Sequence, residues 1–81
     1  MEIQFIHGQF DKNDAIDLIT KMIHIKIKYH ENKIDHSSNE EDIKMRETRI
    51  RQLQKELHNL RKELDTNGSN SIALTSQIEI G

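Results

Sequence analysis

Residues 24 to 30, "HIKIKYH", alternate apolar and polar side chains like a strand, yet they lie inside a longer segment with helical spacing, so the fold class depends on which of the two patterns holds. A strand at this place would need a turn before it, and the preceding "ITKMI", residues 19 to 23, contains no turn-forming residue. On a helix, the apolar residues of this segment fall into two stripes about 130° apart, taking 100° per residue. The alternation is therefore interpreted as two helical stripes that overlap in sequence, and the segment is predicted to be helical.

The predicted first helix covers residues 12 to 35. Asp11 stands before it as a capping residue, with Asp14 three residues later, in the spacing of a capping box. Its first stripe contains Ile16, Ile19, Ile23, Ile27, His30 and Ile34, and its second stripe contains Ala15, Leu18, Met22, Ile25 and Tyr29. The segment "HSSN", residues 36 to 39, is predicted to be the following loop, with Ser38 and Glu41 forming the next capping pattern.

The predicted second helix, residues 39 to 66, has a single regular stripe. Its members alternate spacings of three and four residues, as in a heptad repeat, and are Ile43, Arg46, Ile50, Leu53, Leu57, Leu60 and Leu64. Asn67 and Gly68 supply the residue types that commonly end a helix. A short loop between two such helices predicts an antiparallel hairpin.

The two ends of the chain have the period of a strand. Met1, Ile3 and Phe5 alternate with polar residues, and so do the apolar residues of "SIALTSQIEI", residues 71 to 80. Strands are predicted at residues 1 to 6 and 72 to 80. The predicted fold is thus a single mostly α domain, residues 1 to 81, with a long antiparallel two-helix hairpin between short N-terminal and C-terminal β-strands.

The two helices do not match in their apolar surface. The single stripe of the second helix can cover only one stripe of the first, and the contacts expected inside the hairpin are Ile16, Ile23, Ile27, Leu53, Leu57 and Leu60. Leu18, Met22, Ile25 and Tyr29 are left over. Burying them is worth about 1.5–3 kcal/mol each, or about 6–12 kcal/mol together, against total stabilities of about 5–15 kcal/mol. We therefore expect these four residues to form an oligomer interface, with a homodimer that makes a four-helix assembly as the first expectation.

The composition supports association and excludes several classes of protein. Hydrophobic residues make up 33% of the 81 residues, below the roughly 45–50% usual for a globular domain. With no cysteine, disulfides, thiolate chemistry and cysteine-based zinc sites are excluded. The start of the sequence has no basic leader followed by an apolar run, and no stretch reaches membrane-spanning length, so a cytoplasmic protein without a membrane partner is expected.

No residue pattern indicates a catalytic, cofactor or metal site. His24, His30 and His36 are spaced by six residues and do not converge on a helix, and no two histidines are four apart. The acid, base and hydroxyls of "DHSS", residues 35 to 38, are explained by a turn and a helix cap. The glycines are too far apart for a phosphate-binding loop. We therefore expect a protein that is not an enzyme and binds no cofactor.

The alternative hypothesis concerns a basic part of the second helix. Residues 44 to 62 contain seven Lys and Arg against two Glu. A nucleic-acid-associated regulator would use Arg46, Arg49, Arg51, Lys55, Arg61 and Lys62. Acid-first pairs four residues apart, namely Glu40 with Lys44, Asp42 with Arg46 and Glu47 with Arg51, also explain this charge as a solvated helix face. The favoured hypothesis is a small structural or protein-interaction module that self-associates through its first helix, and nucleic acid is the less favoured partner.

Overall fold

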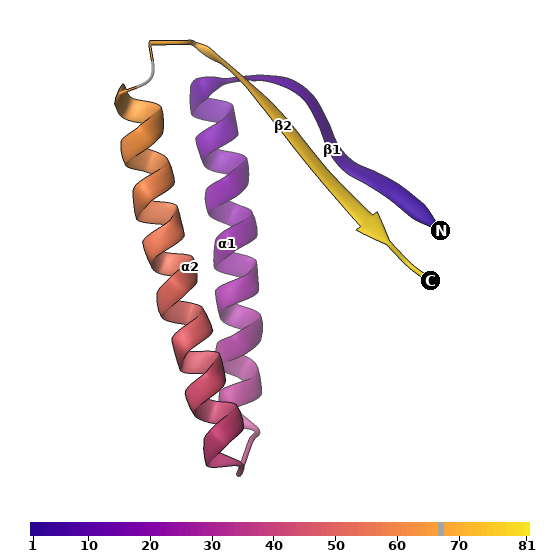
Figure 1. Cartoon of the computed structure of the whole chain (residues 1–81), viewed down its shortest axis with the longest axis vertical. Helices are drawn as coiled ribbons and strands as arrows, with labels where there is room; N and C mark the ends of the chain where they lie inside the picture. Colours follow the sequence, from indigo (N-terminus) through magenta and orange to yellow (C-terminus); the bar gives the residue numbers. More distant parts are fainter. Residues whose placement is uncertain (67) are drawn as a thin grey trace.

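The computed structural model describes residues 1–66 and 68–81 and contains two helices and two strands (Figure 1). In chain order these are β1 (Glu2–Asp11), α1 (Lys12–Asp35), α2 (Glu40–Thr66) and β2 (Ser71–Glu79). The helices form an antiparallel hairpin, and the strands pair antiparallel as a two-stranded ribbon. The mostly α class with flanking strands is confirmed, and residues 24 to 30 are helical.

Side-chain caps set where both helices begin. Asp11 accepts a hydrogen bond from the backbone N–H of Asn13 at 3.2 Å, which confirms its predicted role at the start of α1. At α2 the prediction was wrong by one residue, because Asn39 rather than Ser38 is the cap. The Asn39 side-chain oxygen accepts from the backbone N–H groups of Glu41 at 2.9 Å and Asp42 at 3.2 Å. Ser37 fixes Asn39 in this place, because its hydroxyl accepts from the Asn39 backbone N–H at 3.2 Å. The predicted terminator at Asn67 lies outside the described residues.

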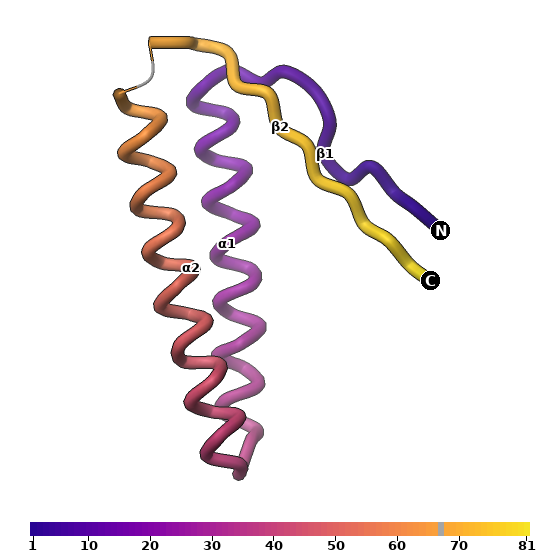
Figure 2. The backbone as a smooth tube through the Cα atoms, in the orientation of Figure 1, coloured from indigo at the N-terminus to yellow at the C-terminus, as the bar shows by residue number. Residues whose placement is uncertain are grey.

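The ribbon is longer than predicted on its N-terminal side. β1 continues to Asp11, which pairs with Ser71, whereas the sequence predicted an end at residue 6. Gly8 has φ 143°, a conformation that residues with a side chain rarely adopt, and it lets the strand curve while it remains paired with β2 (Figure 2). The curved strand leads directly into α1, since Lys12 begins the helix where β1 ends.

A β-bulge at Phe5 gives the ribbon one apolar face. The register shifts between Gln4 and Ile6, so one extra residue lies on β1. A one-residue slip moves every following side chain to the other face. The apolar positions change in step, from odd numbers before the bulge to even numbers after it. Because directly paired residues share a face, the ribbon apolar face consists of Met1, Ile3, Ile6, Phe10, Ile72, Leu74, Ile78 and Ile80.

The core lies between the two helices and is small. Among the described residues, the buried apolar side chains are those of Ala15, Leu53, Leu57 and Leu64. The radius of gyration is 15.3 Å, against about 12 Å for a compact chain of this length. The molecule measures 46 × 34 × 14 Å, so it is thin in one direction. Across residues 1–66 and 68–81, neither helix is long and apolar enough to cross a membrane.

Candidate association surface

The second stripe of α1 is covered at the start of the helix and exposed further along it. Ala15, at the end where the ribbon joins, is fully buried, and Leu18 and Met22 are half-buried. Further along, Ile25 is 71% exposed and Tyr29 is 53% exposed. The ribbon starts beside the first turns of α1 and then moves away from the helix (Figure 1). The ribbon therefore covers the beginning of this stripe and leaves the rest in water.

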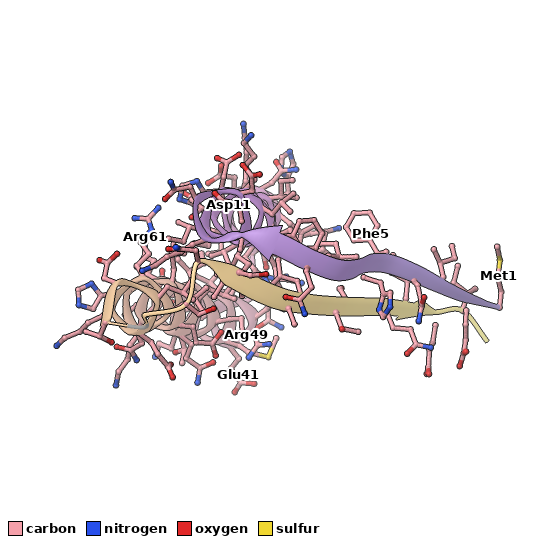
Figure 3. All side chains as sticks on the ribbon, turned by 90° about the horizontal axis from the view of Figure 1, so that it is seen from above. Met1, Phe5, Asp11, Glu41, Arg49 and Arg61 are labelled. Carbon is pink, nitrogen blue, oxygen red and sulfur yellow. The ribbon has the colours of Figure 1, made fainter. Side chains whose placement is uncertain are left out.

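The ribbon apolar face shows the same change in exposure from its joint to its tip. Phe10, Ile72 and Leu74, near the helices, are half-buried. Toward the tip, Ile78 is 40% exposed, Ile80 is 57% exposed and Met1 is 79% exposed. Phe5, in the bulge, projects from the same side of the ribbon as Met1, the side on which α1 lies (Figure 3). The second stripe of α1 and the ribbon apolar face thus begin where the ribbon meets the helix and diverge from there. We call their far ends the association surface, which consists of Ile25 and Tyr29 on α1 and of Met1, Ile3, Phe5, Ile78 and Ile80 on the ribbon.

The residues expected inside the hairpin lie where α1 meets α2. Leu53 and Leu57 are buried, with 4% and 8% of their surface exposed. Ile16, Ile23, Ile27 and Leu60 are half-buried around them. Half-burial of the isoleucines follows from the shape of the molecule, because a single facing helix covers one side of each side chain.

A polar cluster closes the loop end of the hairpin around Arg46, the one charged residue of the α2 heptad. Its guanidinium donates to a carboxylate oxygen of Asp42 at 3.1 Å and lies 3.1 Å from Nδ1 of His30 on α1. The same guanidinium carbon is 5.9 Å from the centre of the Tyr29 ring, and Lys33 Nζ is 5.7 Å from that ring. The heptad position alone marked Arg46 as unusual, but the pairing with His30 depends on the stagger of the two helices.

This environment keeps His30 neutral. Burial lowers the pKa of the His30 imidazole below its ordinary value, and the charges of Arg46, Lys26 and Arg49 lower that pKa further. Arginine has no acceptor, so the contact with Arg46 requires Nδ1 of His30 to accept the hydrogen bond. Protonation would remove this acceptor and place a second positive charge beside the guanidinium. His30 is therefore a packing residue that is sensitive to acid.

A shallow groove of about 490 Å³ lies beside this cluster. His30, Met45, Arg46 and Arg49 are among its lining residues, and Met45 is 62% exposed. Its walls are mainly apolar stems of long side chains. The lining also includes the cationic side chains of Lys44, Arg46 and Arg49 and, among the described residues, contains no carboxylate.

The six basic residues of the alternative hypothesis do not form one surface. Arg46 points into the hairpin. Arg49 and Arg61 lie on different sides of the helix pair (Figure 3), and Arg61 donates to the Thr20 hydroxyl of α1 at 3.2 Å. Taking 100° per residue, the remaining three, Arg51, Lys55 and Lys62, lie within about 40° of one another on the side of α2 opposite its apolar stripe. Half of the proposed nucleic-acid contacts thus point away from the others.

The predicted ion pairs form only in part. In the described part of the chain, Asp42 pairs with Arg46 at 3.1 Å, whereas Glu40 with Lys44 and Glu47 with Arg51 form no salt bridge. On α1, Asp17 pairs with Lys21 at 2.9 Å with both side chains largely exposed. Exposed pairs of this kind contribute little to stability.

Within residues 1–66 and 68–81, no group of three or more His, Asp or Glu side chains could hold a metal ion. No protein-family model, curated protein or solved structure matches the chain.

Proposed function

We propose that this protein is a non-enzymatic interaction module whose function is to self-associate as a homodimer through the second stripe of α1. The observation that carries this proposal is the amount of surface that a single chain leaves open. The chain exposes 6416 Å². A compact monomer of 9.6 kDa exposes about 5,100 Å², so about 1,300 Å² is in excess. A standard protein–protein interface buries about 800 Å² per partner, which this excess can supply.

The kind of surface also supports a dimer. The association surface consists of large exposed apolar side chains on two diverging elements, α1 and the ribbon, and exposed apolar groups of this kind mark interaction sites. A thin molecule of 14 Å gains a second layer when another copy covers it. Two packings would cover Ile25 and Tyr29: the α1 helices of two chains lying against each other in a four-helix assembly, or the ribbon of one chain lying on α1 of the other.

The test is a charge introduced on the α1 part of this surface. In Ile25→Glu with Tyr29→Glu, both altered side chains are more than half exposed in the single chain, and a carboxylate at position 29 stays beside the cations of Lys33 and Arg46, so the hairpin should fold. In the dimer these two side chains would be buried, so their loss should raise the dissociation constant about a hundredfold or more. Sedimentation equilibrium measures this constant. The matched control is Gln54→Glu with Asn59→Glu, which adds the same charge on exposed positions of α2. Equal dissociation constants for the two double variants would refute the proposal.

A nucleic-acid role is the second candidate, supported by one smaller feature. Lys44 joins Arg51, Lys55 and Lys62 in a single outward row along α2, and none of the four forms a salt bridge with a described residue. Phosphate binding by this row predicts a gel shift at low salt that disappears steeply as ionic strength rises. Absence of a shift at low salt excludes this role.

A further inference from the structure

We infer that the tip of the ribbon of one chain covers the exposed end of α1 on a second copy, and that the two copies do this reciprocally. This inference rests on the proposed function and names the segment that occupies the surface. Residues Ile78 and Ile80 with Met1 and Ile3 supply the apolar cover, and Ile25 and Tyr29 receive it. Because each chain carries both parts, a two-fold axis makes two identical contacts, as in an isologous dimer.

The joint of the ribbon explains why the cover comes from another chain. No residue separates β1 from α1, since Asp11 ends the strand and Lys12 begins the helix. The backbone N–H of Lys12 also donates to the carbonyl of Asn70 at 2.9 Å, which ties the second strand to the same point. Both strands are therefore fixed at the helix end, and the ribbon diverges from its own α1 (Figure 2). Its tip does not reach Ile25 of the same chain.

The distribution of charge favours the ribbon over a second α1 as the occupant. Residues 22 to 33 of α1 carry Lys26, Lys28 and Lys33 against one acid, Glu31, whereas Lys21 is already paired with Asp17. The ribbon has no Lys or Arg, and its tip glutamates, Glu2 and Glu79, pair on the face opposite the ribbon apolar face. The apolar face that would cover α1 therefore carries no charged side chain, and its approach brings no lysine or arginine to the lysines of α1.

The same charges disfavour packing of α1 against α1. That arrangement would bring Lys26, Lys28 and Lys33 of each chain near those of the other, and like charges across an interface oppose association. It would also leave the apolar tip of each ribbon in water. Ribbon-on-helix packing covers both ends of the association surface and sets α1 against a segment without lysine or arginine.

Engineered cysteines test this inference directly, because the chain contains no cysteine of its own. A chain with Ile25→Cys is mixed with a chain of different tag length that carries Ile78→Cys, and a short bismaleimide cross-linker is added. We expect cross-links between the two different chains to dominate. In a chain carrying both substitutions, we expect cross-linked dimers rather than cross-linked monomers. Lys55→Cys, on the outer side of α2, replaces Ile25→Cys in the control and measures cross-linking by chance encounter.

Each other outcome overturns the inference in a distinguishable way. Dominant cross-links between two Ile25→Cys chains would show an α1-to-α1 dimer, which leaves the proposed function intact. Cross-links within the doubly substituted chain would show that the ribbon folds onto its own helix. A mixture with no cross-links above the Lys55→Cys control, combined with a monomeric mass, would overturn the proposed function as well.

Discussion

At the scale of single residues, the hairpin depends on polar side chains placed at special positions rather than on its small core alone. Arg46 interrupts an apolar heptad but finds three partners, Asp42, His30 and the Tyr29 ring, at the loop end of the helices. Such a group is costly to break, because removing one partner leaves the others poorly satisfied. The cluster thus fixes the stagger of α1 against α2.

His30 should make the hairpin less stable in acid. Its pKa is lowered on folding, so between the lowered value and the ordinary value of about 6.5 the unfolded chain binds more protons than the folded chain. The free energy of unfolding should therefore fall as the pH drops through about 6.5. His30→Gln keeps an acceptor for Arg46 and does not titrate. In urea unfolding at a series of pH values and one protein concentration, the variant should lose less stability in acid than the natural chain. Parallel curves for the two proteins would contradict this role.

Asn39 should matter more than Ser38 to the start of α2. Asn39→Ala removes the acceptor for two backbone N–H groups and should cost about 0.5–2 kcal/mol of unfolding free energy. Ser38 is exposed and makes neither of these bonds, so Ser38→Ala should change stability by less than about 0.5 kcal/mol. Urea unfolding of the two variants measures the difference. A larger loss from Ser38→Ala would show that the cap lies one residue earlier.

At the scale of elements, the helices were predictable and the ribbon only partly. The spacing of Ile and Leu over more than twenty residues predicts each helix, because a sustained period is a strong signal. β1 was predicted too short, because its alternation changes phase where Phe5 and Ile6 stand side by side. Two adjacent apolar residues between two alternating runs were the available sign of the bulge. The conformation of Gly8, which lets the strand continue, follows from the pairing with β2 and not from the local sequence.

Gly8 should be the residue of β1 least tolerant of a side chain. Its φ of 143° is strained for any other residue, whereas no atom within 4 Å would clash with an added Cβ. Gly8→Ala should therefore cost about 1–3 kcal/mol through the backbone alone. Gln9→Ala, at an exposed neighbouring position, is the matched control and should be nearly neutral. Thermal unfolding followed by circular dichroism compares them, and equal midpoints would show that β1 does not need this conformation.

At the scale of the whole molecule, the excess of apolar surface was foreseeable and its location was not. The sequence shows two apolar stripes on the first helix and one on the second, so one face of α1 has no partner within the hairpin. It does not show that the ribbon covers the half near Ala15 and leaves Ile25 and Tyr29 exposed, because that depends on the angle at which the ribbon leaves the helices. The alternating pattern of the two strands could likewise not predict which residues share the ribbon apolar face, because that depends on the strand register and on the bulge.

The most direct test of the central claim is the molar mass of the natural chain in solution, measured by light scattering after size exclusion at several micromolar concentrations. Because one chain leaves the association surface uncovered, we expect twice the chain mass of 9.6 kDa together with a helical circular dichroism spectrum. A mass of 9.6 kDa at every concentration, from a chain that is helical and unfolds cooperatively, would contradict the claim that a second copy covers this surface.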